Sequence, residues 1–154
     1  MDKKSNRQFQ DVVTRLETLA TLREHLLAYD LLIEAVRARA EKCTASYTGD
    51  VRVQAPHEHD KIDNAVARIE EIREKKQRIL KEYVARHQAM MDLTDGLEEP
   101  ETFAITSRYF RRARLTWPQI AQALGVCERT AYRVHDRAIW QMVAKENEKM
   151  EEQK

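Results

Sequence analysis

The stretch Thr116–Val143, TWPQIAQALGVCERTAYRVHDRAIWQMV, decides the fold. Thr116 and Gln119 stand three residues apart, which is the spacing of a capping box, where two polar side chains satisfy the free N–H groups at a helix start. The pattern predicts a short helix that begins at Trp117. Gly125 is expected to end it, because glycine readily adopts the left-handed conformation that stops a helix.

A longer helix is expected to follow, from about Glu128 to Val143. Val126, between the two helices, is predicted to add a core contact. A short helix, a tight glycine turn and a longer arginine-rich helix are typical of a helix-turn-helix, whose second helix enters the major groove of DNA. The predicted inward residues are Ile120, Ala121, Leu124, Ala131, Val134, Ala138, Ile139 and Met142. The predicted solvent-facing arginines are Arg129, Arg133 and Arg137.

Positive charge is concentrated in this part of the chain. The net charge of all 154 residues is +1, yet the segment from Phe103 to Lys145 holds eight basic and two acidic residues. A local positive field attracts phosphate and raises association rates. Double-stranded DNA is therefore the expected partner.

The composition predicts an all-α protein. Charged residues make up 34% of the chain and hydrophobic residues 42%, while only three glycines and three prolines interrupt it. This balance favours long solvated helices around a modest core. Cys43 and Cys127 match no metal-ligand or redox spacing. Because residues 1–10 form no signal peptide and no stretch is apolar enough to span a membrane, a cytoplasmic location with no membrane partner is expected.

The N-terminal part carries two helical apolar stripes. The first predicts a helix from Val12 to Tyr47, and residues 45–59 are interpreted as a connecting loop. Asp60 is the expected N-cap of a second long helix. The pair predicts an antiparallel, coiled-coil-like hairpin, although self-association into a homo-oligomer would bury the same stripes.

Gly96 and Pro100 mark the end of one helix and the start of another. They place the domain boundary after residue 95. Residues 1–95 are predicted to be a helical hairpin for interaction or oligomerisation, and residues 96–145 a DNA-binding helix-turn-helix. Residues 146–154 are predicted to be a charged tail, either a frayed helix end or disordered.

The stretch Ile105–Met142 resembles the fourth region of bacterial sigma factors, and more closely the sigma-like regulators of phages and prophages of Gram-positive bacteria, akin to ArpU-type and RinA-type late-gene activators. Their pattern has an RYF/I helix, then W-x-x-I-A-x-x-L-G-x-S, then R-T-V-Y-R-x-H-x-x-A. The matching parts here are Arg108–Tyr109, Trp117–Gly125 and Arg129–Ala138. The first ninety-five residues are similar to these regulators only in being helical.

The resemblance implies a transcription regulator with a helix-turn-helix of sigma region 4 type. No other sigma region is recognisable, so it implies an activator or accessory factor, with RNA polymerase as a candidate partner. Three residues depart from the family pattern. Cys127 stands where the family usually has Ser, which removes a good N-cap worth ~1 kcal/mol. Ala131 stands where a larger aliphatic residue is common, and Glu128 is acidic at a usually basic edge. These departures bear on the target sequence more than on the activity.

The position of each polar side chain predicts its role. The first turns of a recognition helix sit deepest in the groove, so Glu128, Arg129, Thr130 and Arg133 are expected to read base edges. The remaining candidates are expected to bind phosphates, which fixes the register without reading sequence. These phosphate-binding candidates are Arg111, Arg112, Arg114, Thr116, Gln119 and Arg137.

Other interpretations are weaker. His57, His59 and Asp60 form no convincing metal-ligand set, and His135 is better explained as a packed structural histidine than as a catalytic base. No phosphate loop, nucleophile elbow or carboxylate pair is recognisable, so neither an enzyme nor a cofactor is expected. Two alternatives stay open. One is a DNA-binding assembly protein such as a phage terminase small subunit, and the other is a helical adaptor for a host protein.

Overall fold

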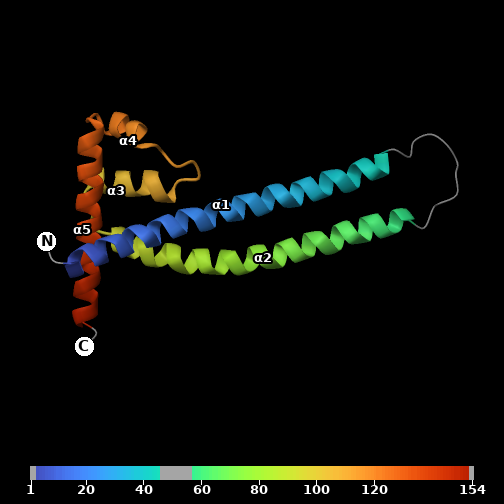
Figure 1. Cartoon of the computed structure of the whole chain (residues 1–154), viewed down its shortest axis with the longest axis horizontal. Coiled ribbons are helices and arrows are strands. Elements are labelled where there is room, and N and C mark those ends of the chain that lie inside the picture. Colours follow the sequence, from blue (N-terminus) through green and yellow to red (C-terminus); the bar gives the residue numbers. More distant parts are fainter. Residues whose placement is uncertain (1–2, 46–56, 153–154) are drawn as a thin grey trace. The chain divides into compact units, whose positions relative to one another are not determined.

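A computed structural model describes the backbone of residues 3–45 and 57–152 and the side chains of residues 3–42 and 61–152. It confirms an all-α protein, because no strand occurs in these ranges. Figure 1 shows the helices in chain order. They are α1 (Lys3–Ala45), α2 (His57–Thr94), α3 (Glu99–Ile105), the π-helical turn η1 (Thr106–Phe110), α4 (Trp117–Leu124) and α5 (Glu128–Glu152).

The two long helices begin earlier than predicted. α1 starts at Lys3 rather than near Val12, and α2 starts at His57, so Asp60 lies inside the helix and is not its N-cap. Residue 47 and most of the predicted loop fall outside the described residues. The side chains of His57, His59 and Asp60, the residues considered above as metal ligands, also lie outside the described residues.

The chain forms two compact units whose limits differ from the predicted domains. The split unit consists of residues 1–23 and 83–154, and the hairpin unit consists of residues 24–82. α1 and α2 each pass from one unit into the other without a break. The start of α1 and the end of α2 therefore cluster with α3, α4 and α5.

The split unit has two buried clusters. The larger one joins the start of α1 and the end of α2 to α5, and it includes Val12, Leu16, Met90, Ile139 and Met142. The smaller one joins α3, α4 and α5, with Ala104, Ile120, Ala121 and Ala131 at its centre. Three of these four residues are alanines, so the three helices approach closely where α4 docks.

α5 extends further than predicted, to Glu152. Two residues of the predicted tail bind the start of α1. Glu146 accepts two hydrogen bonds from the Arg15 guanidinium, at 2.8 and 2.6 Å, and Asn147 accepts one from Gln8 Nε2 at 2.8 Å. The first part of the predicted tail is thus an ordered piece of the split unit.

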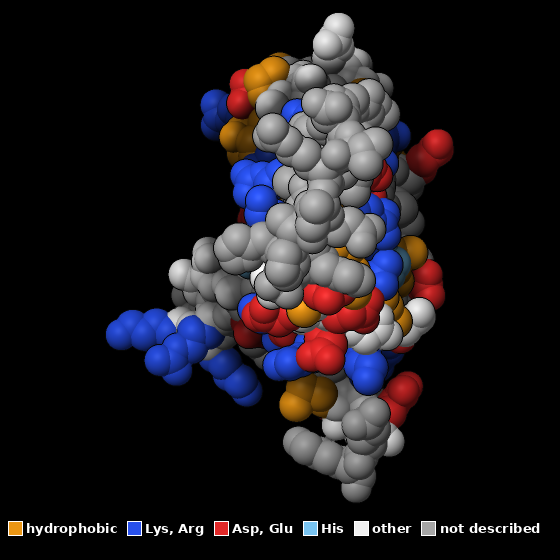
Figure 2. All heavy atoms as spheres, turned by 90° about the vertical axis from the view of Figure 1, so that its right-hand side faces the viewer, with side chains coloured by type: hydrophobic (Ala, Val, Ile, Leu, Met, Phe, Trp, Pro, Cys, Tyr) orange, Lys and Arg blue, Asp and Glu red, His pale blue; other side chains and the backbone are white. Residues whose placement is uncertain are grey.

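The hairpin unit pairs the rest of α1 with the rest of α2 in antiparallel order, as predicted. Lys76 Nζ donates to Asp30 Oδ1 at 2.5 Å, and within α2 Lys75 Nζ donates to Glu71 Oε1, four residues earlier, at 2.6 Å. Lysine, arginine and acidic side chains are interspersed on the face that Figure 2 draws. Leu26, Ile33 and Ile72 are buried, whereas Leu31 is 73% and Val66 54% exposed.

Candidate nucleic-acid interface

α4 begins where the capping box predicts. The Thr116 backbone N–H donates to Gln119 Oε1 at 2.9 Å, the Thr116 side chain accepts from the Gln119 backbone, and Pro118 occupies the first turn, where its missing N–H costs nothing. Both capping residues remain exposed. Their polar atoms can therefore meet a ligand at the start of α4.

The connection between α4 and α5 depends on Gly125. This residue has φ +67°, and its N–H donates to the Gln122 carbonyl at 3.1 Å. The Val126 N–H donates to the Ala121 carbonyl at 3.0 Å, which closes the turn. The prediction that Val126 adds a core contact is wrong, because this residue is 37% exposed. Backbone hydrogen bonds, rather than a buried side chain, set the turn.

α5 is fixed by His135, which is 6% exposed. Tyr109 Oη lies 3.0 Å from His135 Nε2, Asp136 Oδ1 lies 3.1 Å from Nδ1, and the Trp117 ring packs edge-on at 5.0 Å. Burial lowers the pKa of His135 and raises the pKa of Tyr109 to about 12. A neutral imidazole that donates from Nδ1 to Asp136 and accepts from the Tyr109 hydroxyl satisfies both contacts. The packed structural role predicted for His135 agrees with this burial.

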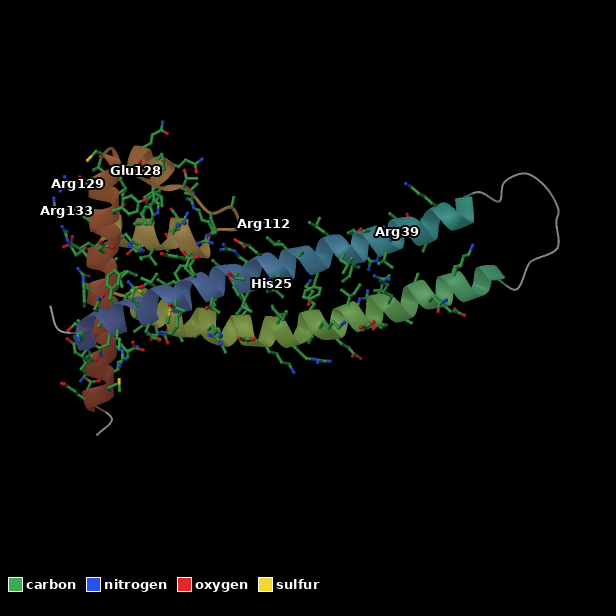
Figure 3. The ribbon with its side chains drawn as sticks, viewed as in Figure 1. His25, Arg39, Arg112, Glu128, Arg129 and Arg133 are labelled. Carbon is green, nitrogen blue, oxygen red and sulfur yellow. The ribbon has the colours of Figure 1, made fainter. Side chains whose placement is uncertain are left out.

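The outer face of α5 carries the predicted base-reading residues. Glu128, Arg129 and Arg133 are exposed. In Figure 3 the two arginines project from the side of α5 that faces away from α3 and α4. Thr130 is half-buried, and its hydroxyl lies 3.2 Å from Cys127 Sγ. This contact, with neighbouring backbone hydrogen bonds, lowers the pKa of the Cys127 thiol.

Arg137, one turn beyond Arg133, has a side chain that is 62% exposed, and its Nε lies 3.6 Å from Glu101 Oε1. Glu101 is 1% exposed and also accepts from Gln141 at 3.2 Å. Sequence reasoning missed this buried carboxylate. Its position three residues after Glu98 is the capping-box spacing that could have revealed it, since the two residues form a capping box at the start of α3.

The three predicted phosphate-binding arginines before α4 lie in different surroundings. Arg111 is exposed and stacks on Phe103 at 5.7 Å. Arg112 is exposed on the loop at the far end of α4 from Arg129 and Arg133 (Figure 3). The structure therefore does not bring Arg112 beside the predicted base-reading residues.

Arg114 makes hydrogen bonds within the protein. Its Nε donates to the Arg108 carbonyl at 3.1 Å, its Nη2 binds Glu17 Oε2 at 2.5 Å, and its side chain is 23% exposed. Arg108 Nη1 in turn donates to the Leu115 carbonyl at 3.2 Å. These contacts tie the loop before α4 to η1 and to α1. Arg114 thus positions the start of α4.

Comparisons with protein-family models, with curated proteins and with solved structures gave no match. In the part of the chain that the structure describes, no helix is both long and apolar enough to cross a membrane. No group of three or more His, Cys, Asp or Glu side chains suited to a metal ion occurs among the same residues.

Proposed function

We propose that this protein binds double-stranded DNA through α4 and α5, which act as a helix-turn-helix of sigma region 4 type. The main support is the outer face of α5, where exposed Arg129 and Arg133 stand one turn apart, directly after a glycine turn with a left-handed φ. The opposite face is fully packed, with Ala131 and Ala138 0% exposed. Only the arginine face of α5 is thus available for a groove.

The geometry supports different roles, base contact and phosphate contact, for different residues of the interface. Glu128, Arg129, Thr130 and Arg133 occupy the first two turns of α5, which we assign to base edges. Thr116 and Gln119 stand exposed at the start of α4 and, with Arg111, Arg112 and Arg137, are assigned to phosphates. Arg114 is assigned to support of the loop, because Glu17 and the Arg108 carbonyl already hold it.

In the cell we propose a cytoplasmic transcription regulator of the phage or prophage kind, which acts at promoters and has RNA polymerase as its candidate partner. The test is sequencing of DNA recovered with the tagged protein from its native host. The wild type is compared with Arg129→Ala, Arg133→Ala and with a control, Arg78→Ala, Lys81→Ala, which removes the same charge from exposed sites on α2.

Discrete promoter peaks are expected in the wild type and in the control, but not in the α5 variant. Loss of a base contact costs about 1–3 kcal/mol, which is roughly 5- to 150-fold in affinity for the site. Equal recovery from the wild type and the α5 variant, or no recovery from either, would contradict the proposal.

Exposed apolar side chains on the hairpin unit favour a second candidate, a DNA-binding assembly protein. Leu31 and Val66 project from its two helices at 73% and 54% exposure, and self-association would cover them. Light scattering separates the two candidates. A ring-sized mass favours assembly, whereas a monomer or dimer that binds a promoter favours regulation.

A further inference from the structure

The start of α1 is fastened to the second half of α5. Gln8 Nε2 donates to Asn147 Oδ1 at 2.8 Å, the Phe9 ring lies 5.0 Å from the Trp140 ring, and Arg15 binds Glu146 at 2.6 Å. These contacts bridge residues more than a hundred positions apart in sequence. The first turns of α1 therefore have a fixed place beside α5.

α1 crosses α5 at these contacts, and its tip, residues 3–7, projects beyond them. About five residues separate Lys3 from Gln8, which corresponds to roughly 7 Å of helix. In the view shared by Figures 1 and 3, the start of α1 crosses α5 and ends at the edge from which Arg129 and Arg133 project.

The tip is strongly basic. Lys3, Lys4 and Arg7 are exposed and, together with Asn6 and Gln10, line a shallow hollow, and none of these described lining residues is acidic. Acidic side chains lie further along α5, at Glu148, Glu151 and Glu152. Glu146, nearer the crossing, is already paired with Arg15. The basic side chains of the α1 tip are therefore a patch of their own, separated along α5 from Arg133 by the exposed Asp136.

The dimensions of DNA fit this arrangement. Trp140, where Phe9 packs, follows Arg129 by eleven residues, or about 16 Å along α5. The major groove is about 12 Å wide. With Arg129 in the groove and α5 directed across it, the crossing point lies beyond the groove's edge, beside the sugar-phosphate backbone.

We propose that Lys3, Lys4 and Arg7 form a second DNA contact, which binds backbone phosphates beside the groove that α5 occupies. This inference rests on the proposed function and extends its interface to the opposite end of the chain. Lysine and arginine at a solvated helix tip bind phosphate without reading bases, so the contact adds affinity and orientation rather than sequence preference.

The test measures binding of the full chain to a fluorescein-labelled 40-base-pair duplex of mixed sequence over a range of KCl concentrations. The variant is Lys3→Gln, Lys4→Gln, Arg7→Gln. The matched control, Lys61→Gln, Arg78→Gln, Lys81→Gln, loses the same three charges from exposed sites in the hairpin unit. A third variant, Lys3→Arg, Lys4→Arg, Arg7→Lys, keeps the charge at the tip, and circular dichroism verifies that all three are folded.

Each phosphate contact contributes about 0.9 to the slope of log affinity against log salt. We expect the tip variant to have a slope shallower by about 2 to 3, while the control and the charge-preserving variant keep the wild-type slope. A tip variant with the wild-type slope overturns this inference alone. Absence of duplex binding by the wild type, or unchanged binding to the promoter site by Arg129→Ala, Arg133→Ala, overturns the proposed function as well.

Discussion

Gly125→Ala tests the turn on which the α4–α5 arrangement depends. An alanine at φ +67° costs about 1–2 kcal/mol, because its Cβ crowds the following carbonyl in the left-handed conformation. No neighbouring atom lies within 4 Å of the added Cβ, so no packing clash is added. The smaller unfolded-state entropy of alanine offsets about 0.4–1 kcal/mol. The net loss in the free energy of unfolding is therefore about 1 kcal/mol, a roughly fivefold change in the unfolding equilibrium constant.

Urea unfolding followed by tryptophan fluorescence measures this loss. Both tryptophans, Trp117 and Trp140, lie in the split unit, so the signal reports on that unit. With a slope near 2 kcal/mol/M, the midpoint should fall by about 0.5 M.

Two further variants control for this effect. Gly125→Asn should retain most of the stability, because asparagine tolerates the left-handed conformation. Gly96→Ala, at φ +87° after α2, should lower stability similarly but leave DNA affinity unchanged. An alanine variant at position 125 as stable as the wild type, or an asparagine variant that loses as much as alanine, would refute the reasoning.

Two other predictions concern the contacts around α5. Burial lowers the pKa of His135 from its usual value of 6.5, so near that pH the unfolded chain binds more protons than the folded one. The contribution of His135 to the free energy of unfolding is therefore full above pH 6.5 and is lost as the pH falls through the folded-state pKa. In urea unfolding at several pH values between 7.5 and 5, His135→Gln should reduce the fall in the free energy of unfolding with pH. A variant whose free energy of unfolding falls as steeply as that of the wild type would contradict the assignment. Removal of residues 146–154 deletes the Arg15–Glu146 and Gln8–Asn147 contacts and should cost about 1–2 kcal/mol in the same assay, whereas removal of residues 149–154 should cost nothing measurable. Equal stability of the two truncated chains would show that these contacts contribute nothing.

Local signals in the sequence predicted the local structure well. The capping box at Thr116, the glycine at position 125 and the start of α5 at Glu128 are all confirmed, because each depends on residues within one or two helical turns. The apolar period likewise predicted the buried face of α5. The outward direction of Arg129 and Arg133 follows from the same period.

Long-range features could not be predicted in this way. The limits of the two units fall inside continuous helices, where neither glycine nor proline marks them. Arg114 looks like any exposed base in the sequence, because its acidic partner, Glu17, is 97 residues away. The π-helical turn η1 ends with a hydrogen bond from the Arg111 N–H to the Thr106 carbonyl, five residues back, and this spacing leaves no periodic signal in the sequence.

The sequence order of the split unit imposes a delay during synthesis. Val12, Leu16 and Leu19 are covered in part by Ile139 and Met142, which are made more than a hundred residues later. At a synthesis rate of about 5–20 residues per second, these partners are made roughly 6–25 s after the apolar face of α1. The nascent chain therefore carries an uncovered hydrophobic stripe during most of translation, and a chaperone or a second nascent chain would meet that stripe first.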